Sequence, residues 1–114
     1  MAAIWEHSID PYDVNDFSVD CTGILESGES ISQYSLVVLP QSELLGLQIK
    51  SGGGYGPVVN GNIITMWLDI LETEQGNPAF SGAGITLPFE LNITTDSVPP
   101  RKKQRTLSVR VLQK

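Results

Sequence analysis

The fold is decided by FELNITTDSVPPRKKQRTLSVRV, residues 89–111. On either side of its central turn, apolar and polar residues alternate one by one. A period of two residues is typical of half-buried β-strands. The alternating apolar residues are Phe89, Leu91, Ile93, Leu107, Val109 and Val111. The stretch therefore predicts an antiparallel hairpin whose turn is SVPPRKKQ, residues 97–104.

The remaining chain contains shorter segments of the same kind, separated by glycine-rich or polar turns. IITMWLDIL, residues 63–71, is apolar on both faces, which predicts a central strand with Trp67 in the core. The other expected strands are residues 16–21, 31–39, 44–51, 58–59, 85–95 and 105–113. No segment has the period of an amphipathic helix. The pattern predicts an all-β protein, with an extended N-terminal arm at residues 1–15 and a single antiparallel β-sandwich of about seven strands at residues 16–114.

Charge is divided unevenly along the chain. Six of the seven Lys and Arg residues lie in residues 101–114, whereas all thirteen carboxylates precede residue 97. One cation and thirteen carboxylates give residues 1–100 a formal charge of −12, and residues 101–114 carry +6. Because strand patterns flank the basic segment, it is expected as a hairpin loop and not as a free tail. It lacks the interleaved aromatic residues of nucleic-acid sites, and the acidic remainder repels phosphate, so no nucleic-acid partner is predicted.

This charge pattern favours docking between proteins. Opposite charges on different parts of one domain suit head-to-tail or ring contacts between copies. The acidic arm and first strand of a neighbouring subunit are the expected counterpart of the basic hairpin. The arm also carries the large apolar side chains of Trp5 and Tyr12, which can dock the arm onto its own domain or onto a neighbour. The candidate contact residues are Trp5, Tyr12, Asp13, Asp16, Arg101, Lys102, Lys103 and Arg105.

The sequence offers little for catalysis or metal binding. His7 is the single histidine, and the single cysteine, Cys21, falls on the apolar face of its strand, where an inert buried thiol is the usual outcome. The acids at positions 10, 13, 16 and 20 do not follow the EF-hand spacing, which favours a solvated face. We therefore expect no enzyme activity, no cofactor and no metal. No secretory signal and no membrane span are expected either.

Several stretches, taken in order, resemble a group of small virion proteins of tailed bacteriophages that are often described as fiber-tail adaptors. The stretches are DPYDVNDFSVD at 10–20, GESIS at 28–32, TMWL at 65–68, and the closing strands at 89–95 and 105–111. The N-terminal stretch is the most specific of them. The chain differs from the pattern at Cys21, where relatives often have Trp, and in its closing turn, which in relatives is usually compact and contains glycine. Its loop at residues 72–86 is also longer than usual.

The resemblance implies an immunoglobulin-like (Ig-like) β-sandwich that serves as a non-enzymatic part of a virion. Such a protein would be made in the cytoplasm of the bacterial host and assembled in several symmetric copies at the tail or neck. Its partners would be tail, neck and fiber subunits, with neither nucleic acid nor membrane among them. An alternative virion role is capsid decoration or a head fiber. A less favoured alternative is a carbohydrate-binding module, for which the candidate aromatic residues are Trp5, Tyr34, Tyr55 and Trp67.

Overall fold

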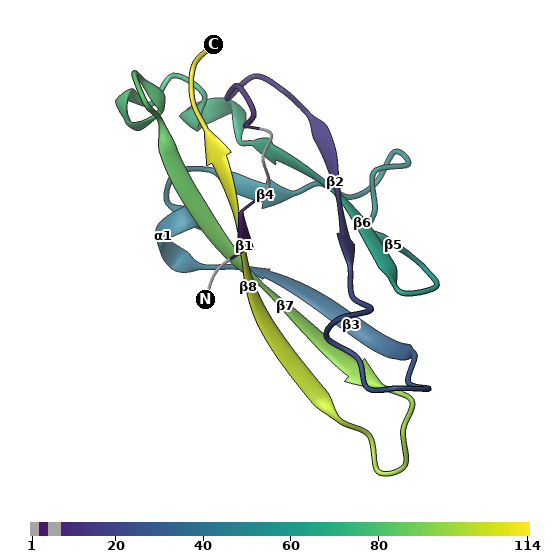
Figure 1. Cartoon of the computed structure of the whole chain (residues 1–114). Coiled ribbons are helices and arrows are strands. Elements are labelled where there is room, and N and C mark those ends of the chain that lie inside the picture. Colours follow the sequence, from purple (N-terminus) through teal and green to yellow (C-terminus); the bar gives the residue numbers. More distant parts are fainter. Residues whose placement is uncertain (1–2, 5–7) are drawn as a thin grey trace.

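The protein folds as a sandwich of two β-sheets (Figure 1), which confirms the predicted all-β class. The computed structural model describes residues 3–4 and 8–114. In spatial order, the first sheet contains β1 (Ala3–Ile4), β8 (Lys102–Val111), β7 (Ile85–Thr95) and β3 (Ile31–Val38). The second contains β2 (Asn15–Asp20), β6 (Ile63–Ile70) and β4 (Leu47–Ile49), with β5 (Val58–Asn60) also paired to β6. Among the strand pairs of these described residues, only β1–β8 is parallel.

The alternation seen in the sequence determines which side chains enter the core. Along β7 every second residue from Leu87 to Thr95 is buried, and on β8 the buried apolar residues are again two apart. β6 is the central strand of its sheet, as predicted, because β2 pairs with one edge and β4 and β5 with the other. Burying a large apolar side chain contributes roughly 1.5–3 kcal/mol. The fully buried residues that dominate this core are Ile9, Ile64, Met66, Leu68, Ile70, Phe80, Leu87, Phe89, Leu91, Ile93, Val109 and Val111.

Trp67 does not lie in the core, so this prediction was wrong. The inward positions of β6 are the even-numbered ones from Ile64 to Ile70, and strand alternation therefore turns Trp67 outward, where it is half-buried. The glycine-rich loop after β4 folds over this outer face. Its Tyr55 ring meets the Trp67 ring edge-on, with centroids 5.3 Å apart and an interplanar angle of 79°. Lys50 lies 5.1 Å from the centre of the Tyr55 ring and pairs with Asp69 at 3.7 Å.

Short helical turns occupy three connections, although the sequence shows no helical period. They are α1 (Pro40–Glu43), η1 (Glu72–Glu74) and η2 (Pro78–Phe80). Pro40 opens α1, a position where its missing N–H costs nothing. The chain then turns at Gly46, whose φ of 88° and close approach to the Glu74 side chain leave no room for a Cβ atom. The third strand therefore begins at residue 47 and not at residue 44 as predicted.

The closing turn is shorter than predicted. β7 and β8 pair from Ile85–Val111 down to Thr94–Lys102, so four of the basic residues lie in β8 and only residues 96–101 form the loop. Each further residue pair in the β7–β8 ladder gives backbone N–H and C=O groups hydrogen-bond partners, and this gain does not depend on the polarity of the side chains. For this reason strand pairing extends beyond the apolar alternation that reveals it in the sequence.

The N-terminal segment predicted as an arm is attached to the sandwich in its described part. Ile9 is fully buried, its N–H donates to the Arg110 carbonyl at 3.0 Å, and its carbonyl accepts the Leu112 N–H at 3.0 Å. β2 begins at Asn15, one residue earlier than predicted. Trp5, one of the candidate contact residues, lies outside the described residues.

Candidate docking site at the tip of the last hairpin

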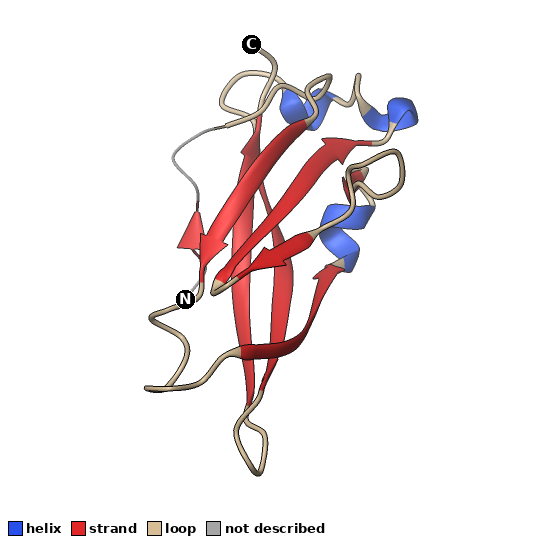
Figure 2. Ribbon diagram, turned by 90° about the vertical axis from the view of Figure 1, so that its right-hand side faces the viewer, coloured by secondary structure: helices blue, strands red, loops and turns tan. Residues whose placement is uncertain are grey.

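The tip of the β7–β8 hairpin forms one end of the molecule, and the C-terminus lies at the other (Figure 1). The short helices gather away from this tip (Figure 2). The loop is held closed by Thr95, whose N–H donates to the Arg101 carbonyl and whose Oγ1 accepts the Arg101 N–H, both at 2.9 Å. The Ser97 hydroxyl bonds to Thr95 Oγ1 at 2.8 Å and donates to the Pro99 carbonyl at 3.0 Å. These bonds and the two fixed φ angles of Pro99 and Pro100 give the loop a defined shape.

The apex of the loop is apolar and projects into solvent. Val98 is 98% exposed, and Pro99 and Pro100 are also exposed. A scattered apolar side chain on a surface needs no explanation, but three consecutive ones on a braced projection are a candidate contact.

Arg101 is engaged by an acidic residue of its own chain. Its Nη1 donates to Glu29 Oε2 at 2.8 Å, and the Glu29 side chain is only 4% exposed. The other carboxylate oxygen of Glu29 accepts the Glu26 N–H at 2.8 Å. The Glu26 N–H first, and Arg101 second, lower the pKa of Glu29 to about 2, because both stabilise the charged carboxylate. The Arg101 side chain therefore stabilises the fold through this ion pair and is not a free docking group.

The loop at residues 21–30 is joined to the hairpin at further points. Ser30 and Asp96 exchange two bonds: the Ser30 N–H donates to Asp96 Oδ1 at 2.8 Å, and the Asp96 N–H donates to the Ser30 carbonyl at 3.1 Å. Lys103 pairs with Glu26 at 3.3 Å. The loop thus lies against the hairpin near its closing turn (Figure 1) and braces it through these bonds.

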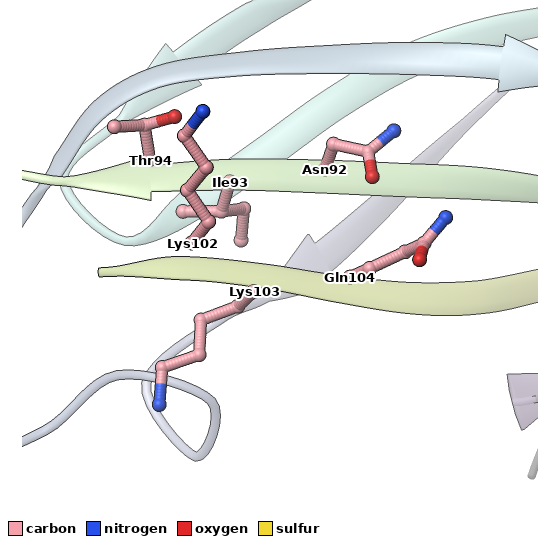
Figure 3. Close-up of a pocket in the computed structure, with 6 residues that line it drawn as sticks. All are labelled: Asn92, Ile93, Thr94, Lys102, Lys103 and Gln104. Carbon is pink, nitrogen blue, oxygen red and sulfur yellow. The ribbon is translucent and has the colours of Figure 1, made fainter. Parts of the chain in front are cut away.

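Lys102 lies on the opposite face. Figure 3 shows its side chain on the same side of the hairpin as Asn92, Thr94 and Gln104, above a shallow hollow, whereas Lys103 points the other way. Arg105 is exposed and donates to the Gln104 carbonyl at 2.8 Å. Among residues 3–4 and 8–114, neither Lys102 nor Arg105 forms an ion pair. Of the four basic candidates, two are neutralised within the chain and two keep their charge for a partner.

The structure places the acidic turn at residues 10–13 far from Lys102. The carboxylate of Asp10 accepts the Tyr12 N–H at 2.9 Å and the Lys114 N–H at 2.8 Å. The second bond holds the acidic turn, residues 10–13, against Lys114. Asp13 bonds to the Asp10 N–H at 3.0 Å. This turn therefore lies beyond the C-terminal end of β8, and Lys102 begins that strand. Ten residues at about 3.3 Å each separate the two groups by roughly 30 Å.

The other N-terminal candidates face solvent. Tyr12 is 64% exposed at the acidic turn. Asp16 is exposed on β2, opposite Trp67 in the register of the second sheet. Both are therefore accessible, but neither contributes to the hairpin tip.

An apolar groove on the side of the sandwich was not predicted from the sequence. It lies between β3 and β4, which are the edge strands of the two sheets on that side. Its lining residues are Leu36, Val37, Val38, Glu43, Leu47, Gln48, Ile49 and Leu71, and a smaller hollow at Pro40 and Leu44 adjoins it through the shared Glu43. These residues come from separate segments of the sequence. The one signal in the sequence is the run of apolar residues 36–38, which makes both faces of β3 apolar at this point.

Groups suited to chemistry are not gathered in the described part of the chain. There, no three His, Cys, Asp or Glu side chains are placed to share a metal ion. No helix in the same residues combines the length and the apolar character needed to cross a membrane. Cys21, expected on an apolar face, is fully buried just after β2. Burial first, and the nearby Asp20 charge second, raise the pKa of its thiol.

Comparison of the sequence with protein-family models gives no match, and comparison with curated proteins gives none.

Proposed function

We propose that this protein is a non-enzymatic structural component of a tailed-phage virion, an adaptor that joins tail fibers to the tail or neck. It is made in the cytoplasm of the bacterial host and acts in several symmetric copies beside tail, neck and fiber subunits. Two features support the proposal: the resemblance of residues 10–20 and of the closing strands to such adaptors, and the β-sandwich that this resemblance implies.

The observation that carries the proposal is the braced hairpin end with its exposed apolar apex. Sites for small molecules are concave, whereas Val98 stands on a convex projection. A convex apolar surface fits a complementary pocket on another protein. The bonds of Thr95 and Glu29 hold the loop in one shape before docking, which lowers the entropy lost on binding.

The distribution of charge supports a role in assembly. Glu29 and Glu26 already pair with Arg101 and Lys103, so the basic end carries less free charge than the sequence suggests. Lys102 and Arg105 remain for contacts with acidic surfaces of neighbouring subunits. Exposed pairs of this kind contribute more to orientation and specificity than to affinity.

Purified virions test the proposal. Quantitative mass spectrometry should detect the chain in particles at the copy number of a tail or neck ring, and cryo-electron microscopy should place it there. A copy number on the scale of the capsid subunits, with density on the head, would instead support the decoration role. Absence of the chain from purified particles would refute both.

A further inference from the structure

Two exposed apolar surfaces of this protein differ in form: one is a projecting loop and the other is a groove. One is the tip, defined here as Val98, Pro99, Pro100 and Lys102. The other is the groove between β3 and β4, defined by the lining residues given above together with Leu44. Neither surface is covered within residues 3–4 and 8–114, and contiguous apolar surface of this kind marks interaction sites.

The groove presents apolar side chains on a concave surface. Leu44 is 78% exposed, Val37 is 46% exposed and Leu71 is 44% exposed, so its rim is accessible. Its walls are the free edges of β3 and β4, each of which pairs with a neighbouring strand on one side only. An unpaired strand edge also offers backbone N–H and C=O groups to an incoming segment.

The charges of the two surfaces are opposite. Glu43 is the charged residue among those that line the groove and the adjoining hollow. The tip carries Lys102, which forms no ion pair within residues 3–4 and 8–114. An apolar apex beside the cation Lys102 therefore matches an apolar groove that contains the carboxylate of Glu43.

The tip of a chain cannot reach the groove of the same chain. Val37 is level with Glu90 on β7, whereas the tip loop begins at Asp96. Six residues of extended strand separate these positions by roughly 20 Å, and the β7–β8 ladder is paired over this length. A tip that occupies a groove must come from another molecule.

We propose that the hairpin tip of one copy docks into the β3–β4 groove of a second copy. The contact is heterologous, because each copy offers two different surfaces, and repetition produces a ring or an open chain of copies. A hairpin tip buries less area than a standard interface, so each contact is weak alone and gains strength when a ring closes. That this contact operates in a virion rests on the proposed function. The contact itself does not, because it can be measured with the purified chain alone.

Sedimentation velocity on the purified full-length chain, over a wide concentration series, tests the contact. The unmodified chain should self-associate, and association should weaken at high salt. Val98→Asp at the tip and Leu44→Lys in the groove should each weaken association by about tenfold or more, because each places a charge in an apolar contact. Val58→Asp on β5 is the control: Val58 is an exposed apolar residue, 57% accessible, that lies outside both surfaces. It should associate like the unmodified chain.

A mixture of the two disabled variants gives the sharpest result. Val98→Asp keeps an intact groove and Leu44→Lys keeps an intact tip, so their equimolar mixture should form a one-to-one dimer and grow no further. As a second pair, Lys102→Glu should weaken association and Glu43→Lys should restore it in the double variant. Circular dichroism melting checks that each variant is folded.

Three outcomes would overturn the proposal: an unmodified chain that stays monomeric at the highest concentration, a mixture without dimer, or a Val58→Asp variant that loses association equally. Binding of a fiber or tail subunit by the tip of a chain that is otherwise monomeric would assign the tip to that partner instead. The virion test above is independent, since a monomeric chain can still be found in particles and a self-associating one can be absent from them.

Discussion

The Arg101 guanidinium donates to the Glu29 carboxylate at 2.8 Å, across 72 positions of the sequence. The pair joins the tip of the last hairpin to the loop between β2 and β3. It also divides the basic segment into residues that stabilise the fold and residues that face outward.

Two neighbouring cations should therefore respond differently to charge reversal. Arg101→Glu places two carboxylates together at the nearly buried Glu29 and should lower the melting temperature clearly. Lys102→Glu, one residue later, should leave the melting temperature almost unchanged, because exposed positions without a structural partner usually tolerate substitution. Thermal melts followed by circular dichroism measure both. Equal destabilisation by the two variants would contradict the assignment of Arg101 to the fold.

The stability contributed by Glu29 should depend on pH. Its pKa is lowered from an ordinary 4.5 to about 2 in the folded protein, so folding favours the charged carboxylate. The stabilisation is fully present above pH 4.5 and is lost as the pH falls from 4.5 towards 2. Urea unfolding of the unmodified chain and of Glu29→Gln, at a series of pH values, should give a difference that is constant above this window and shrinks within it. A difference that stays constant down to the lowest pH would argue against the ionised pair.

The Cys21 thiol should be protected in the folded protein. It is fully buried and its pKa is raised, and both effects suppress the thiolate that reacts with disulfide reagents. Ellman's reagent should therefore label Cys21 only after addition of denaturant. A Val98→Cys variant supplies the control, since a thiol at the 98% exposed apex should react at once and give one equivalent before unfolding. Rapid labelling of the unmodified native chain would show that the segment after β2 opens readily.

Phe89 should be among the most costly residues to truncate. It is fully buried in β7, between the neighbouring strands β3 and β8. Phe89→Ala removes apolar burial and leaves a cavity, which together cost about 3–5 kcal/mol. Val58→Ala on the exposed edge strand should stay within about 0.5 kcal/mol. Equilibrium urea unfolding measures both values, and a small loss for Phe89→Ala would mean that the core collapses around the gap.

The strands were predictable because their signal is local. Alternation of apolar and polar residues identified the segments that became β2, β4, β7 and β8, and the double-sided apolar pattern identified β6 as a central strand. The same signal could not decide which face of β6 carries Trp67, since both faces are apolar. It also predicted a closing turn that extends to residue 104, whereas β8 begins at Lys102. Backbone pairing continues through Lys102 and Lys103 although these side chains are not apolar.

The candidate surfaces were only partly predictable. The basic segment was visible in the sequence as a run of charges, and Val98 and its prolines were visible as a turn. The pairing of Arg101 with Glu29 was not, because residues so far apart meet only once the loop at 21–30 folds against the hairpin. The groove was hidden for the same reason: Val38, Ile49 and Leu71 belong to different segments that packing brings together.

The sequence by itself determined where most strands lie and that the last fourteen residues carry six of the seven cations, because alternation and charge are properties of neighbouring positions. Only the tertiary structure decided how that charge is used. Packing of residues 21–30 against the hairpin neutralises Arg101 and Lys103 and leaves Lys102 beside an exposed apolar apex. The free charge of the hairpin therefore depends on which side chains the fold brings within hydrogen-bonding distance. Neither the composition nor the spacing of residues in the sequence reveals these pairs.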